Sequence, residues 1–142
     1  MLLDDIADYL ASQGGSGVGV VGTNLFKGYR PETPDLCLAI YETGGMRPTR
    51  AMTPSAGTVV TENPGLQLVG RSAPEDYQTV RTRMHNAFVL LDGFPERSIN
   101  GTLYKYIVAR QSIQGMGRDE NQRVLLVANF DVVKALSTST ST

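Results

Sequence analysis

Apolar residues recur at every third or fourth position between residues 72 and 93. The repeated positions are Tyr77, Val80, Met84, Phe88 and Leu91. This spacing predicts an amphipathic helix of about five turns. Residues 72–75, Ser-Ala-Pro-Glu, are typical of a capping box at a helix start, and Gly93 predicts the helix end. Such a helix needs a sheet against which its apolar side can be buried.

Shorter patterns predict a second helix and the strands of that sheet. Apolar residues share one side of residues 2–13, which predicts a short N-terminal helix. Apolar runs predict strands at residues 36–43, 66–71, 102–111 and 123–134, and near residues 21–27. Asn100-Gly101 predicts a tight hairpin between residues 97–99 and the following strand. The order predicts an α+β fold, with a mixed or mostly antiparallel sheet of about four or five strands and the long helix on one face.

Two longer segments have no regular pattern. Glycine and proline recur through residues 44–64, where we expect a long loop; loops of this length are often functional. Alternatively, residues 58–61 could pair with a neighbouring strand as part of an arm or hairpin. Residues 111–122 predict a second, polar loop. We expect one domain, residues 1–134, followed by a flexible serine/threonine tail, residues 135–142.

Composition narrows the possible functions. The 142 residues include 13 basic and 14 acidic side chains, for a net charge of −1, which argues against a dedicated nucleic-acid binder. The single cysteine, Cys37, excludes an intramolecular disulfide and favours a reducing compartment. Because the first residues are acidic and no apolar run approaches about 20 residues, we expect no export signal, no membrane span and assembly in a cytoplasm.

The residues that could carry chemistry do not form a persuasive site. Residues 17–22 match the dinucleotide-binding pattern G-x-G-x-x-G, which needs a strand before it and a helix after it. Here a predicted helix comes before these residues and a predicted strand comes after them, so we predict a turn that leads into a strand. His85 is the only histidine, and it lies outside the apolar side of the predicted helix, which favours an exposed position. Cys37 has apolar neighbours and is predicted to pack in the core. We therefore expect no enzyme activity, no cofactor and no metal site.

Several segments taken together resemble the minor capsid or tail terminator family of long-tailed phages (siphophages), over about residues 1–134. The most specific are Tyr41-Glu42-Thr43-Gly44-Gly45 and Gly117-Arg118-Asp119-Glu120. The resemblance implies a tail-terminator-like fold and a structural virion protein that caps the tail tube as a ring, usually hexameric, and joins it to the head connector. The implied partners are other copies of the chain, the major tail tube protein and a head-completion or connector protein. DNA would only pass through the lumen, and no membrane is involved.

A ring built head to tail needs two different patches on each subunit. We expect one patch in the long loop and the other in the segment 117–123. The candidate contact residues are Thr43, Gly45, Arg47, Arg118, Asp119 and Glu120.

Three other functions remain open at this point. The first is a head-completion or connector ring protein, which would share this size and symmetry. The second is an enzyme, either a nucleotide-binding one that uses residues 17–22 or a hydrolase that uses Cys37. The third is a small adaptor that binds a host protein.

Overall fold

The computed structural model describes residues 2–50 and 59–135. Two α-helices, a short 3-10 turn (η1) and seven strands occupy these ranges. In chain order they are α1 (Leu2–Gly14), η1 (Gly15–Gly17), β1 (Leu25–Lys27), β2 (Cys37–Arg50), β3 (Val59–Ser72), α2 (Tyr77–Leu91), β4 (Arg97–Ile99), β5 (Thr102–Ala109), β6 (Gln114–Arg118) and β7 (Val124–Ala135). The expected serine/threonine tail lies outside the described residues, apart from Ala135, which ends β7.

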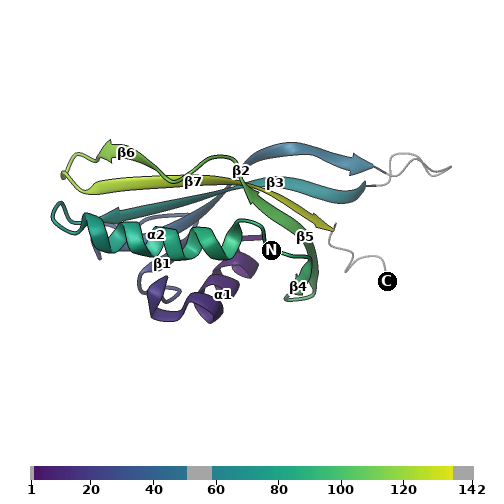
Figure 1. The fold of residues 1–142 in the computed structure, drawn as a ribbon, viewed down its shortest axis with the longest axis horizontal. Helices are drawn as coiled ribbons and strands as arrows, with labels where there is room; N and C mark the ends of the chain where they lie inside the picture. Colours follow the sequence, from purple (N-terminus) through teal and green to yellow (C-terminus); the bar gives the residue numbers. More distant parts are fainter. Residues whose placement is uncertain (1, 51–58, 136–142) are drawn as a thin grey trace.

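The strands form one sheet in the order β1-β2-β3-β7-β5-β4, and β6 pairs with β7 on the side where β5 also pairs. Only β1 and β2 run parallel among the described pairs, and the others are antiparallel. Both helices lie on one face of the sheet, and β2 and β3 extend well beyond them (Figure 1). The α+β class and the mostly antiparallel sheet are confirmed. The expected strand number was too low, because β6 and the short β1 and β4 add to the four long strands.

The core lies between the helices and the sheet. The buried residues of α2 are Val80, Met84, Ala87 and Leu91. A Cβ atom built on Gly70 of β3 would lie 2.7 Å from Met84 Cγ and 2.9 Å from Val80 Cγ2, so α2 rests directly on β3. On α1, the buried apolar residues are Leu2, Ile6, Ala7 and Leu10, which confirms the predicted helix and most of its buried side.

The start of α2 differs from the prediction. Ser72 is the last residue of β3, where it pairs with Val124, and its Oγ donates to the carbonyl of Ala73 at 3.0 Å. The helix begins at Tyr77, and its N-cap residue, Asp76, makes no side-chain capping bond. The capping-box prediction is therefore wrong, because the ladder with β7 holds Ser72 in the strand. The helix is shorter than expected, 15 residues, and Tyr77 in its first turn is 48% exposed.

The predicted hairpin at Asn100-Gly101 is confirmed. Ile99 pairs with Thr102, and the two turn residues have φ values of 51° and 84°. A two-residue turn of this type needs positive φ at both positions, which asparagine and glycine tolerate better than other residues.

A buried carboxylate links α1 to β5. Asp5 is 2% exposed, and it accepts hydrogen bonds from the Tyr104 hydroxyl at 2.5 Å and from Asn100 Nδ2 at 3.0 Å. Burial, together with the hydrogen bond to the Asp5 carboxylate, raises the pKa of Tyr104, so its hydroxyl stays a donor at ordinary pH. Because the burial of Asp5 depends on Tyr104, a residue far along the chain, the local sequence does not predict it.

Replacing Tyr104 with phenylalanine should lower the free energy of unfolding by about 1.5–3 kcal/mol, because a buried carboxylate loses one of its donors. Urea unfolding of the variant and the wild type would measure the loss. Tyr106→Phe is the matched control, since Tyr106 lies on the same strand but is 47% exposed. Equal stability of the two variants would contradict the role assigned to Asp5.

Candidate partner-binding surfaces

The first surface is a long hairpin arm, residues 43–50 of β2 and 59–65 of β3. The sequence predicted a loop over residues 44–64, but β2 continues to Arg50 and pairs there with Val59. The loop prediction is therefore wrong for the described part of this segment, and the alternative of a hairpin arm is confirmed. Residues 51–58 lie outside the described residues.

Glycines and a proline fit within the arm because of a bulge. Thr43 pairs with Gly65 and Met46 with Asn63, so Gly44 and Gly45 together stand opposite Pro64. A bulge leaves one residue out of the ladder, and it therefore accommodates a proline, which lacks an N–H. Thr43 and Gly45 are exposed on β2, and Arg47 lies further along the same strand.

The second surface is the β6–β7 turn, residues 118–123. The sequence predicted a loop over residues 111–122, but residues 114–118 form β6, all of it exposed, against β7. The Asp119 carboxylate accepts hydrogen bonds from the backbone N–H groups of Asn121 and Arg123, both at 2.9 Å, and from Arg123 Nε at 2.7 Å. Partial burial opposes ionisation of Asp119, but the bonds from Arg123 outweigh it and hold its pKa below the usual range.

These contacts give the three candidate residues of the turn different roles. Asp119 shapes the turn, and Arg123 fastens it to the body by donating from Nη1 to the carbonyl of Glu32 at 2.9 Å. Arg118 donates to the carbonyl of Gln122 at 2.8 Å and remains exposed, as does Glu120. The exposed charged groups of this turn are therefore those of Arg118 and Glu120.

The six candidate contact residues thus form two groups, and the structure does not bring them together. Figure 1 shows the arm at one end of an elongated molecule and the turn between β6 and β7 at the other end. The two groups of candidate residues therefore lie at opposite ends of the molecule.

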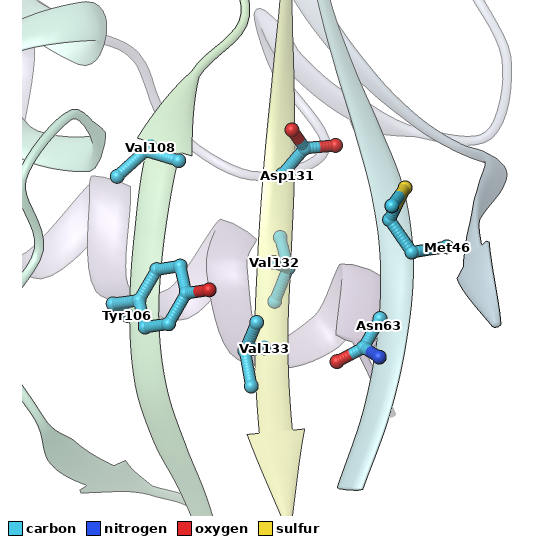
Figure 2. A pocket seen from close by; sticks show the side chains of 7 residues that line it. All are labelled: Met46, Asn63, Tyr106, Val108, Asp131, Val132 and Val133. Carbon is cyan, nitrogen blue, oxygen red and sulfur yellow. The ribbon is translucent and has the colours of Figure 1, made fainter. Parts of the chain in front are cut away.

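The third surface is a hollow on the sheet face opposite the helices, which the sequence reasoning missed. It has a volume of about 410 Å³, and Met46 and Asn63 of the arm, Tyr106 and Val108 of β5, and Val133 of β7 line it (Figure 2). Met46 is 67% exposed, and Asp131 at the rim forms an ion pair with Arg110 at 2.7 Å. The alternation of Tyr106 and Val108 with buried Ile107 was a signal that both faces of this strand carry apolar side chains. Most of the side chains that line it are apolar, so the hollow is suited to an apolar side chain.

The positions considered for catalysis lie where the sequence predicted them. Cys37 is 1% exposed beside Phe26 and Ala39, as predicted, and burial raises the pKa of its thiol. His85 is exposed on α2, also as predicted. Residues 17–22 begin at the last residue of η1 and lead into β1. No strand precedes them and no helix follows them directly, which removes the basis of a dinucleotide site.

The described ranges contain no group of three or more His, Cys, Asp or Glu side chains that could hold a metal ion. Neither described helix is long and apolar enough to cross a membrane.

Comparison with known protein families identifies a match. A family model described as bacteriophage tail terminator protein matches residues 10–135, which is most of the chain and includes all but the first turns of the described fold. No curated protein sequence matches the chain.

Proposed function

This chain belongs to the bacteriophage tail terminator family, and from that premise we propose that it caps the finished tail tube as a hexameric ring and forms the surface that joins the tail to the head connector. Membership makes the chain a structural protein of the phage virion that associates with other tail or head–tail proteins. The ring, its copy number and the joining surface are the proposal.

The observation that carries the proposal is the position of the arm and the β6–β7 turn at opposite ends of the molecule (Figure 1). A closed ring of identical subunits uses heterologous contacts, in which one patch of each subunit meets a different patch of the next. The arm, with Thr43, Gly45 and Arg47, would provide one patch. Arg118 and Glu120 would provide the other, on a turn whose shape Asp119 maintains.

Size and charge are compatible with a DNA-conducting ring. A compact chain of this length has a radius of gyration of about 14–15 Å, and a hexameric ring of such bodies encloses a hole roughly one subunit wide. The net charge of −1 suits a channel through which DNA must slide, because phosphate contacts to basic groups dominate DNA affinity.

Mass measurement of the purified protein, alone and mixed with tail tubes, tests the ring. We expect a hexameric species, either free or only when tubes are present. We also expect phages without the protein to make tails of abnormal length or tails that do not attach to heads. A monomer under both conditions would overturn the ring, and normal attached tails without the protein would overturn the terminator role. Labelled protein located inside the head connector, away from the tube end, would instead identify a head-completion ring protein.

The double substitution Arg118→Ala with Glu120→Ala should raise the protein concentration needed for half-maximal ring assembly by about fivefold to tenfold. Each exposed charge contributes little by itself, but the same loss is repeated at every junction of the ring. Sedimentation or light scattering over a dilution series would measure the change. The pair Glu75→Ala with Arg81→Ala, on the loop before α2 and on α2, is a charge-matched control that should leave assembly unchanged.

A further inference from the structure

Two strand edges of the sheet are open, one on each side. β1 pairs with β2 only as far as Ile40, and within the described residues no strand pairs with the outer edge of β2 beyond it. On the other side of the sheet, β6 pairs with β7, and no described strand covers its outer edge. An open edge exposes unpaired N–H and C=O groups that can pair with a strand of another molecule.

Bulges interrupt both edges, but Gln114–Arg118 of β6 and residues 41–47 of β2 contain no lysine and no proline. Exposed edge strands are commonly blocked by lysine, proline or inward-pointing charges. β6 reads Gln-Gly-Met-Gly-Arg, is exposed throughout and includes Met116, which is 56% exposed. The free part of β2 begins Tyr-Glu-Thr-Gly-Gly-Met, and its first proline is Pro48. Main-chain groups that could form a short ladder are therefore open on both edges, on either side of each bulge.

We propose that β6 of one subunit pairs antiparallel with the free edge of β2, from Tyr41 onward, in the next copy of this chain, so that the sheets join head to tail around the ring. This inference rests on the ring proposed above and specifies its main-chain contact. The direction follows from the topology: β3 is antiparallel to β2, β7 to β3 and β6 to β7, so β6 runs opposite to β2. A ring that continues the sheet keeps that relation at each junction.

Charge and side-chain direction agree with this pairing. Glu42 pairs with Leu66 and Arg118 with Val124, and both partners belong to the core under the helices, so Glu42 and Arg118 extend from the same face of the sheet. The pairing brings these opposite charges beside each other. On the other face it brings Thr43 beside Met116, because the bulge between Gly115 and Arg118 takes up one residue.

The geometry also closes. Within one subunit, Arg118 pairs with Val124, and Val124 pairs with Ser72 of β3. By the register of β3 with β2, Ser72 stands opposite the residue just before Cys37, which is about six residues along β2 from Glu42. Joining the two edges therefore requires a stagger of about 20 Å along the strands. The strands β2, β3, β7 and β6 together with the junction make four strand spacings per subunit, about 19 Å, so the strands would tilt by roughly 45° to the ring axis. This tilt is at the upper end of the range typical of closed β-structures.

Cysteine cross-linking tests the pairing. In Thr43→Cys/Met116→Cys, oxidation with copper phenanthroline should produce a ladder of disulfide-linked oligomers up to the closed ring on a non-reducing gel. The single variants and the control pair Thr43→Cys/Val89→Cys should produce no such ladder, since Val89 is exposed on α2, on the other face of the sheet. The wild type should also stay uncross-linked, because Cys37 is buried.

Charge reversal provides a second readout. Glu42→Arg and Arg118→Glu should each raise the concentration for half-maximal assembly by about tenfold or more, through like charges placed beside each other. The double variant should return to within about threefold of the wild type. Rings of wild-type mass that neither cross-link nor show this rescue would overturn the strand pairing and leave the terminator function intact, whereas absence of any ring would overturn the proposed function itself.

Discussion

Replacing Phe130 with alanine is expected to remove about 3–5 kcal/mol from the free energy of unfolding and to lower the melting temperature by roughly 10–20 °C. Phe130 is fully buried on β7, where it pairs with Leu66 of β3 and with Ala109 of β5. Its ring packs on Phe88 of α2 at a centroid distance of 5.6 Å. The substitution would open a cavity where the central strands meet the helix, and the loss is large beside the total stability of about 5–15 kcal/mol that domains usually have.

Thermal and urea unfolding would measure the effect of Phe130→Ala. Phe130→Leu should cost much less, because it keeps most of the apolar volume. Val89→Ala should change the free energy of unfolding by less than about 0.5 kcal/mol, since Val89 is 59% exposed. A loss below about 1 kcal/mol for Phe130→Ala would mean that β7 is not the centre of the core.

The parts of this fold that depend on local chemistry were predictable from the sequence. The tight turn at Asn100-Gly101 depends on two residues that accept positive φ, and the structure has it at the same place. Gly93, predicted to end the long helix, follows it with a φ of 75°. The N-terminal helix and the last strand were found because their apolar patterns are long and regular.

The parts that depend on distant partners were not predictable. The segment Gln114 to Arg118 has the composition of a loop, and it becomes a strand only because β7 offers an edge with which to pair. Residues 44–50 contain two glycines and a proline, and they remain in a strand because two register shifts accommodate them. Gly44 and Gly45 lie in the shift opposite Pro64, and Pro48 lies in the next one, between Met46 and Thr49. Ser72 had the sequence of a helix cap, but pairing with Val124 keeps it in β3. In each case the tertiary partner outweighed the local preference.

The same distinction applies to the candidate contact residues. The sequence indicated Thr43, Gly45 and Arg118 through a family resemblance, and the structure places them on two separate exposed surfaces. It could not indicate the hollow formed by Met46 and Tyr106, because these residues come from strands that are distant in sequence (Figure 2). Nor could it show that Asp119 is already engaged by Arg123 within its own turn.

Replacing Gly45 with alanine should abolish ring assembly while the body of the protein stays folded. A Cβ atom at this position would lie 2.0 Å from the carbonyl oxygen of Asn63 and 2.6 Å from the backbone nitrogen of Gly65. Both are main-chain atoms of β3, so the two strands of the arm would have to separate at the bulge. The arm beyond it would then lose the geometry that the neighbouring subunit contacts. Sedimentation of the variant with and without tail tubes would show the loss of the ring.

The adjacent glycine provides the control for Gly45→Ala. A Cβ atom at Gly44 would meet no heavy atom within 4 Å, so Gly44→Ala adds the same methyl group to the same strand without separating it from β3. We expect this variant to assemble normally. Both variants should keep wild-type melting of the body, because the main core lies between the helices and the sheet and includes no residue of the arm. If Gly45→Ala formed rings as readily as Gly44→Ala, the arm would not be a ring contact, and assembly would have to depend on another surface.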